Sequence, residues 1–106
     1  MAKEIELKGD DDFEKIIAEN KDKPTFVDFY ANWCGPCKKL GPQIHKVVEE
    51  LQCVLIKVNV DNNQKLAEKF NISGIPKVFL YKNGEKASEF TGYNLKELEK
   101  LKNSCK

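Results

Sequence analysis

Two of the four cysteines stand three residues apart, in the segment Trp33-Cys34-Gly35-Pro36-Cys37. Two thiols at this spacing can close a small disulfide ring if the residues between them turn, and Gly35-Pro36 suits a turn that enters a helix. The strand predicted before this segment ends near Tyr30, and a helix starts close to Cys34. At a helix N-terminus the free backbone N–H groups and the positive end of the helix dipole favour a thiolate, so the pKa of Cys34 is expected below the usual value of about 8.5.

The position of each thiol along the predicted helix distinguishes their roles. Cys37 lies one turn deeper than Cys34 and is expected to be the more protected of the two. We therefore expect Cys34 to attack a substrate disulfide and Cys37 to resolve the mixed disulfide that results, with release of reduced substrate.

Two other uses of this cysteine pair are less favoured. A structural disulfide closing so short a loop constrains the unfolded chain little. A closed zinc site needs four ligands, and the chain has no second Cys-x-x-Cys and no paired histidines. The single histidine, His45, lies off the apolar face of the predicted helix and is expected to be solvated rather than a ligand or a catalytic base.

The two remaining cysteines are expected to differ from each other. Cys53 opens an almost wholly apolar strand, so we expect a buried and unreactive thiol. Cys105 stands one residue from the C-terminus, beyond the predicted apolar helix face, and is expected to be exposed. It either has no physiological task, or it is a site for glutathione or for a covalent dimer under oxidising stress.

Composition limits the class of protein. The chain has 106 residues, 41% hydrophobic and 33% charged, with a net charge of +1. These values fit one globular domain, 1–106, and give no reason to expect nucleic acid or an anionic membrane as a partner. No apolar run approaches the roughly 20 residues of a transmembrane helix. The first eight residues alternate charged and apolar types without a signal-peptide core, so the cytoplasm is the expected location.

Hydrophobic patterns predict the elements that position the cysteines. Strands are expected around Ile5 and Leu7, over 25–30, 53–60 and 77–81, and over 87–90 after the hairpin signal Asn83-Gly84. A first helix is expected after the capping carboxylates at 10–12, with Phe13, Ile16 and Ile17 buried. A second helix is expected from Cys34 to Leu51, with a kink at Pro42, and a third around Leu66 and Phe70. A last helix is expected after an Asn94/Glu97 capping box, with Leu95, Leu98 and Leu101 buried.

The predicted order is β-α-β-α-β-α-β-β-α, which indicates an α/β fold. Strands separated by helices are expected to pair in parallel, whereas the Asn83-Gly84 hairpin must be antiparallel. The result is a mixed sheet with helices on both faces.

The segment from Phe26 to Lys38 resembles the active-site strand and turn of the thioredoxin family. Gly74-Ile75-Pro76, Asn83-Gly84-Glu85 and Gly92 match later landmarks of that family in order and spacing, so the resemblance covers essentially the whole chain. The Gly-Pro dipeptide between the cysteines is characteristic of thioredoxins rather than of glutaredoxins or protein disulfide isomerases. A disulfide isomerase or oxidase, and a binding module without redox turnover, are the competing functions.

The resemblance implies a thioredoxin fold with a five-stranded mixed sheet and four helices. It also implies a protein-disulfide reductase that holds no cofactor and no metal and is recharged by an NADPH-dependent thioredoxin reductase. Its substrates would be disulfide-containing proteins such as peroxiredoxins or ribonucleotide reductase, and the protein would be mainly monomeric. The Ile75–Pro76 bond is expected to be cis, and a docking surface is implied around Cys34, formed by Trp33, Gly35, Pro36, Ile75, Pro76 and Gly92.

Asp28 is the most informative residue after the cysteines, because a carboxylate inside an apolar strand is costly unless it is paired or functional. A solvated acid on an edge strand is the alternative. The resemblance implies that Asp28 is buried beneath the second cysteine and exchanges its proton, and that Lys57 on the adjacent strand interacts with it. Lys57 could instead be a strand-end lysine that only extends to solvent.

Three positions depart from the family pattern: Tyr30, Asn32 and Lys77, the last where threonine is usual. Lys77 is an added cation that could lower the pKa of Cys34 or bias substrate choice.

Overall fold

The computed structural model describes residues 1–9 and 11–106, and within them the elements follow the predicted order. The strands are β1 Lys3–Glu6, β2 Thr25–Tyr30, β3 Val54–Asn59, β4 Lys77–Lys82 and β5 Glu85–Thr91; the helices are α1 Phe13–Glu19, α2 Gly35–Leu51, α3 Gln64–Lys69 and α4 Leu95–Asn103. Asp12 caps α1 by accepting a hydrogen bond from the Lys15 N–H at 3.1 Å. The predicted capping residue Asp10 lies outside the described residues.

The described strands form one mixed sheet in the order β1-β3-β2-β4-β5. β3 pairs in parallel with both β1 and β2, and β4 with β5 forms the predicted antiparallel hairpin. Asn83 and Gly84 both have positive φ, 55° and 82°, as a tight hairpin turn requires.

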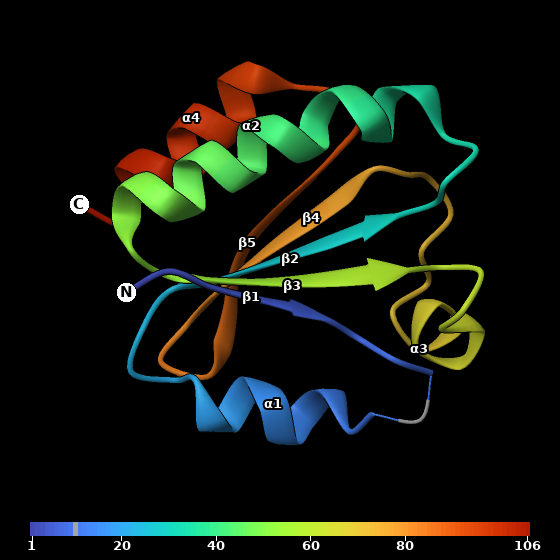
Figure 1. Cartoon of the computed structure of the whole chain (residues 1–106), viewed down its shortest axis with the longest axis horizontal. Helices are drawn as coiled ribbons and strands as arrows, with labels where there is room; N and C mark the ends of the chain where they lie inside the picture. The colour runs from blue at the N-terminus through green and yellow to red at the C-terminus, as the bar shows by residue number, and fades with distance from the viewer. Residues whose placement is uncertain (10) are drawn as a thin grey trace.

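The pairing of β4 with β2 is antiparallel, so the expectation that helix-separated strands pair in parallel is wrong here. The connection from Asn59 to Lys77, which contains α3, stays at the end of the sheet where β3 ends, and does not return the chain along the sheet as α1 does between β1 and β2. β4 therefore starts at the edge where β3 ends and runs the opposite way (Figure 1).

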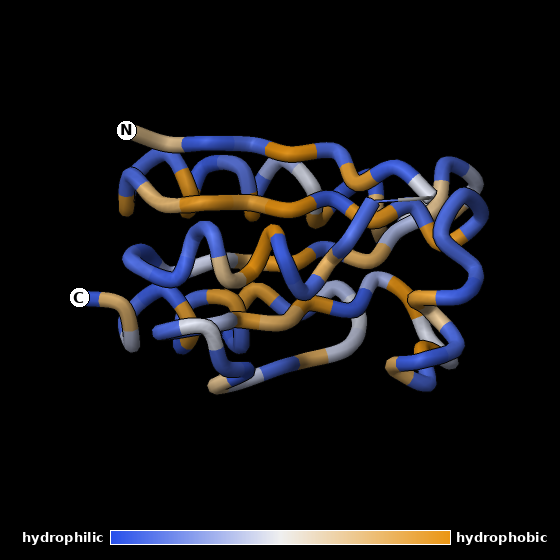
Figure 2. The backbone as a smooth tube through the Cα atoms, turned by 90° about the horizontal axis from the view of Figure 1, so that it is seen from below, coloured by the Kyte–Doolittle hydropathy of each residue, from blue (hydrophilic) through white to orange (hydrophobic). Residues whose placement is uncertain are grey.

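Helices cover both faces of the sheet, with α2 and α4 on one and α1 and α3 on the other (Figure 1). Each face has its own apolar core. Phe26, Leu40 and Leu98 belong to the core under α2 and α4, and Phe13, Phe29 and Phe79 belong to the core over α1 and α3. Figure 2 shows the long apolar stretches of backbone that supply these two cores.

α2 carries the cysteine pair and runs through Pro42 without a break. Pro42 has no N–H to donate to the carbonyl of Lys38, one turn earlier. Of the apolar positions that recur at helical spacing in α2, Leu40, Ile44, Val47 and Val48 are buried, whereas Leu51 at the end of the helix is half-buried. They hold α2 against the sheet, which fixes its N-terminus at the end of β2.

α4 departs from its prediction at one residue. Asn94 caps the helix, accepting a hydrogen bond from the Glu97 N–H at 3.1 Å, and Leu98 and Leu101 are buried. Leu95, expected on the same face, is 43% exposed. Helical side chains lean toward the N-terminus, so that of the first residue extends past the start of the helix instead of onto the sheet.

No helix within 1–9 and 11–106 is both long enough and apolar enough to cross a membrane.

Candidate functional site

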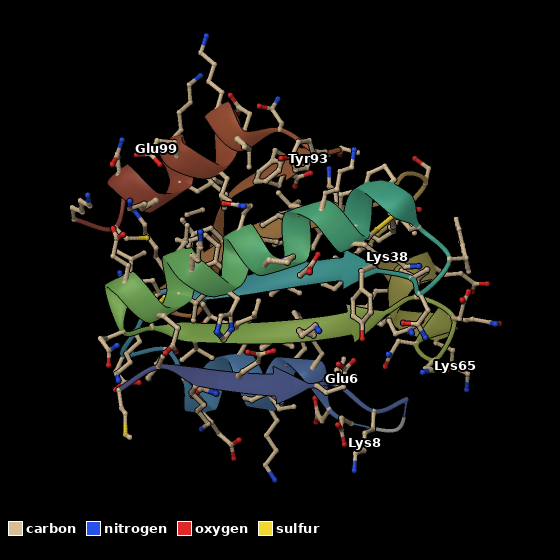
Figure 3. All side chains as sticks on the ribbon, turned by 45° about the horizontal axis from the view of Figure 1, so that its top comes forward. Glu6, Lys8, Lys38, Lys65, Tyr93 and Glu99 are labelled. Carbon is tan, nitrogen blue, oxygen red and sulfur yellow. A yellow bond between two sulfur atoms is a disulfide. The ribbon has the colours of Figure 1, made fainter. Side chains whose placement is uncertain are left out.

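Cys34 and Cys37 form a disulfide at the N-terminal end of α2, visible as the yellow sulfur–sulfur bond in Figure 3. Cys34 is the N-cap residue with extended backbone, and its Sγ accepts a hydrogen bond from the Cys37 N–H at 3.2 Å. Gly35 and Pro36 occupy the first two helical positions, where proline loses no helical hydrogen bond. The first turn of α2 holds no acidic residue, so no side chain in it offsets the helix dipole. The predicted placement of Cys34 is confirmed.

The expected difference in protection between the two cysteines is not found in this disulfide form, because each is 5% exposed. The bond holds both sulfurs under the same apolar cover, which includes Ala31 and Ile75. The two cysteines differ instead in their surroundings. Cys37, and not Cys34, lines a cavity of about 590 Å³ together with Asp28 and Lys57.

The predicted docking residues gather around this disulfide. The Ile75–Pro76 bond is cis, and Ile75 packs against the buried cluster that Ala31 forms with the two cysteines. Gly92 donates its N–H to the Pro76 carbonyl at 2.8 Å, with φ of +90°, a conformation that disfavours other residues. Trp33 is 70% exposed, and Gly35 and Pro36 are also exposed.

The position of Trp33 depends on a residue that the sequence did not single out. Its Nε1 donates to Asp61 Oδ2 at 3.0 Å, and the Asp61 N–H donates to Asn59 Oδ1 at 2.9 Å. Asp61 follows β3, which is parallel to β2, so the residues after both strands lie at the same edge of the sheet. The sequence feature that could have identified Asp61 is the polar run that directly follows the apolar strand β3.

Asp28 is buried in the interior of the sheet, 3% exposed, between Lys57 on β3 and Val78 on β4. The alternative of a solvated acid on an edge strand is therefore wrong. The Oδ1 atom of Asp28 has no hydrogen-bond partner within the described residues. Burial raises the pKa of Asp28 to about 7, against the opposing charge of Lys57, and Glu6 adds to the rise.

Lys57 is half-buried in the interior of β3, so it is not a strand-end residue. Its Nζ lies 4.9 Å from the centroid of the Tyr30 ring. The Tyr30 hydroxyl donates to Glu6 Oε2 at 2.8 Å. Burial is the first cause that raises the pKa of Tyr30, followed by its hydrogen bond to Glu6.

Lys77 extends onto the neighbouring strand β5. Its Nζ lies 2.8 Å from Glu89 Oε1 and donates to Thr91 Oγ1 at 2.9 Å. The hydrogen bond from Lys77 is also the first cause of the lowered pKa of Glu89. The charge of Lys77 is thus compensated by a carboxylate, which weakens the idea that it acts as an extra cation on Cys34.

His45 is exposed, as expected, and its Nδ1 lies 3.0 Å from Glu4 Oε2. Among the residues that the structure describes, no group of three or more histidine, cysteine or acidic side chains could hold a metal ion.

The two spare cysteines differ less than predicted. Cys53 is buried, and burial raises the pKa of its thiol to about 11. Cys105 is half-buried rather than exposed, and its Sγ donates to the Leu101 carbonyl at 3.4 Å. The chain continues in a turn after α4 and is held by Lys82, whose Nζ donates to the Ser104 carbonyl at 2.6 Å. This turn places Cys105 against the core instead of in solvent.

Comparison with known proteins places this geometry among thioredoxins. The family model described as Thioredoxin matches residues 4–106. Thioredoxin-T of Drosophila melanogaster is 37% identical over 103 residues, which are 95% of this chain and 64% of that protein. Two further curated relatives are matched over 54% and 49% of their lengths, so the chain spans between about half and two thirds of these relatives.

Solved structures match over nearly the full chain. Reduced Schistosoma mansoni thioredoxin pre-protein superposes with a TM-score of 0.90 and 36% identity, covering 99% of this chain and all of that one (100%). A chain from a structure on the thiol resolving mechanism in yeast mitochondrial 1-Cys peroxiredoxin via glutathione/thioredoxin systems gives a TM-score of 0.84 at 29% identity, covering 94% of this chain and 93% of that one.

Proposed function

The chain belongs to the thioredoxin family, whose members are thiol–disulfide oxidoreductases, and we propose that it reduces disulfides in protein substrates. The observation that carries the proposal is the position of the Cys34–Cys37 disulfide. It caps α2, packs against Ile75, and borders the cavity that holds the buried Asp28. Members of the family work through their own cysteine pair without a bound cofactor.

The proposed reaction begins with both cysteines reduced. The Cys34 thiolate attacks one sulfur of the substrate disulfide, which forms a mixed disulfide and releases one substrate thiolate. The Cys37 thiolate then attacks the Cys34 sulfur and releases the second substrate thiolate. Two electrons pass to the substrate, which takes up two protons. The protein is left with the disulfide that the structure contains.

Asp28 supplies the proton step in this proposal. The Cys37 thiol is a poor nucleophile until it loses its proton, and Cys37 and Asp28 line the same cavity. A carboxyl group whose pKa is raised to about 7 is present in both charge states at neutral pH. The Asp28 carboxylate takes the proton of Cys37 during resolution, and Lys57 stabilises the charged form of Asp28 beforehand.

Substrate binding is assigned to the surface around Cys34, formed by Trp33, Gly35, Pro36, Ile75, Pro76 and Gly92. An extended substrate segment would pair with the backbone at Ile75, so that main-chain hydrogen bonds provide affinity for many sequences. The exposed Trp33 indole, fixed by Asp61, would cover the apolar part of the substrate beside the reacting disulfide.

We further propose that an NADPH-dependent thioredoxin reductase recharges the dithiol, so that the protein carries electrons from NADPH to its targets. Peroxiredoxins are candidate targets, supported by the peroxiredoxin study that contains a structural neighbour, and ribonucleotide reductase is another. Residues 1–106 would act as one domain, mainly as a monomer, in the cytoplasm.

The proposal is tested by reduction of insulin with NADPH and a thioredoxin reductase. The parent chain should consume NADPH in proportion to insulin disulfide reduced, and Cys34→Ser should lose this activity because the attacking thiolate is gone. Cys105→Ser is the control, since it removes a thiol far along the chain from the disulfide. Equal rates for the parent chain and Cys34→Ser would contradict the proposed reaction.

A further inference from the structure

Three ionisable residues stand in a row across three adjacent strands. Lys57 on β3 is the register partner of Glu6 on β1 and of Asp28 on β2. Register partners on parallel strands project to the same face of a sheet, so all three side chains lie on one face. Lys57 therefore stands between two carboxylates, of which only Asp28 faces the cavity bordered by Cys37.

Tyr30 connects the outer carboxylate to the row. It lies two residues after Asp28 on β2, and therefore on the same face. Its hydroxyl holds Glu6 Oε2 at 2.8 Å, and its ring lies 4.9 Å from Lys57 Nζ. In the described part of the chain, Lys57 forms no ion pair within 4.0 Å with either acid. Glu6, an exposed residue labelled near the end of β1 in Figure 3, is thus held by Tyr30 on the face of the sheet that carries Lys57.

The remaining surroundings of Asp28 do not provide a comparable second charge. β4 contributes the apolar Val78 directly opposite Asp28. Glu4, also on β1, is paired with His45 of α2 at 3.0 Å. The other titratable groups of α2 that border the same cavity are Cys37, one of the two reacting cysteines, and the exposed Lys38. Glu6 is therefore the acid best placed to compete with Asp28 for Lys57.

We propose that Glu6 is a positioning residue for Asp28: by sharing Lys57 through Tyr30, it limits how strongly the ammonium group stabilises the Asp28 carboxylate. This inference rests on the proposed function, in which Asp28 accepts the proton of Cys37. Burial favours neutral Asp28, Lys57 favours the anion, and the negative charge of Glu6 offsets part of the effect of Lys57. The balance leaves Asp28 able to accept and return a proton near neutral pH.

The direct test is a titration of the Asp28 carboxyl carbon by NMR, on the oxidised protein, with no substrate or reductase present. Glu6→Gln removes the charge and keeps an oxygen that accepts from Tyr30. Strands two apart are separated by about 10 Å, so the Asp28 midpoint should fall by about half a pH unit to one unit. Tyr30→Phe, which releases Glu6 without removing its charge, should give a smaller fall.

Glu4→Gln is the matched control, because it removes the same charge from the same strand and face, two residues earlier. It should leave the Asp28 midpoint nearly unchanged. An unchanged midpoint in Glu6→Gln overturns the proposal, and so do equal shifts in Glu6→Gln and Glu4→Gln, which would indicate an unspecific effect of net charge. Thermal unfolding of each variant verifies that the fold is retained.

A second measurement separates this inference from the proposed function. The rate at which the mixed disulfide is resolved should rise at lower pH in Glu6→Gln than in the parent chain, whereas Asp28→Asn should remove this pH dependence. If Asp28→Asn has no effect on the profile, the proton role of Asp28 fails. If Asp28→Asn removes the dependence and Glu6→Gln leaves it in place, only the role of Glu6 fails.

Discussion

At the scale of single residues, the roles of Cys34 and Cys37 in the disulfide exchange depend on the groups that surround each sulfur. Cys34 and Cys37 are equally buried in the disulfide, so exposure alone does not assign their roles. The assignment comes from the helix: Cys34 is the N-cap, and Cys37 lies inside the first turn and borders the cavity of Asp28. A thiolate at the cap is stabilised by the helix N-terminus, and the Asp28 carboxylate, which lines the same cavity as Cys37, can accept the proton of that thiol.

This assignment predicts the outcome of a trapping experiment. In Cys37→Ser the mixed disulfide forms on Cys34 and is not resolved, so a covalent complex with a disulfide substrate should accumulate. In Cys34→Ser no complex should accumulate, because the remaining thiol lacks the helix cap. Mass spectrometry of the tryptic peptides locates the adduct. An adduct found on Cys37 instead would reverse the two roles.

At the scale of elements, sequence patterns predicted what depends on local geometry. The Asn83-Gly84 turn, the Asn94 cap and the start of α2 at Cys34 were all predicted, since each follows from the preferences of a few adjacent residues. Antiparallel β4 was missed because the path of the connection through α3 is set by tertiary packing, and the apolar pattern around Leu66 does not define whether that connection returns along the sheet.

The sequence also did not predict the directions of side chains at the ends of helices and strands. The side chain of Lys77 is directed by Glu89 and Thr91 on the next strand, and Trp33 is held by Asp61 from a loop far along the chain. Such partners are set by tertiary structure, which periodicity does not encode. Asp28 was identified because a charge within an apolar run is conspicuous in any register.

The turn after α4, which the hydrogen bond from Lys82 to Ser104 holds in place, changes the reactivity expected of Cys53 and Cys105. Cys105 is half-buried, but its backbone lies in the last turn, where chains open readily. Cys53 is enclosed, and a pKa of about 11 leaves it about 100-fold less thiolate than a thiol with a pKa of 9. With Cys34 and Cys37 held as their disulfide, iodoacetamide should therefore modify Cys105 much faster than Cys53, as measured by peptide mass spectrometry.

The contact between Lys82 and Ser104 offers the control for this prediction. Lys82→Met removes the hydrogen bond that holds the C-terminal turn, so it should speed the modification of Cys105 and leave Cys53 unaffected. Equal rates for both thiols in the parent chain would show that the C-terminal turn opens no more often than the backbone at Cys53, directly before β3. A non-reducing gel of oxidised protein tests the Cys105-linked dimer, and a wholly monomeric band would exclude it.

At the scale of the whole molecule, the buried carboxyl group links function to stability. In the unfolded chain Asp28 titrates with a pKa near 3.8, and in the folded protein near 7. The folded state therefore binds the proton more tightly, and the contribution of this proton to the free energy of unfolding is fully present below pH 3.8. Stability falls as the pH rises through this interval, by about 4 kcal/mol in total, because folding then has to bury a charge.

Asp28→Asn should thus make the protein more stable and less active at the same pH. The amide stays neutral, so the free energy of unfolding of the variant should exceed that of the parent chain at pH 8, and the difference should shrink toward pH 4. Guanidinium unfolding at pH 4, 6 and 8 measures this difference, with Asp22→Asn, at an exposed acid, as the control.

Turnover of the Asp28→Asn variant at pH 8 should fall, because resolution of the mixed disulfide loses its proton acceptor. A variant with lower stability than the parent chain at pH 8 would mean that the Asp28 carboxylate is stabilised by contacts stronger than the charge of Lys57, and that the carboxyl group is retained for folding instead of catalysis.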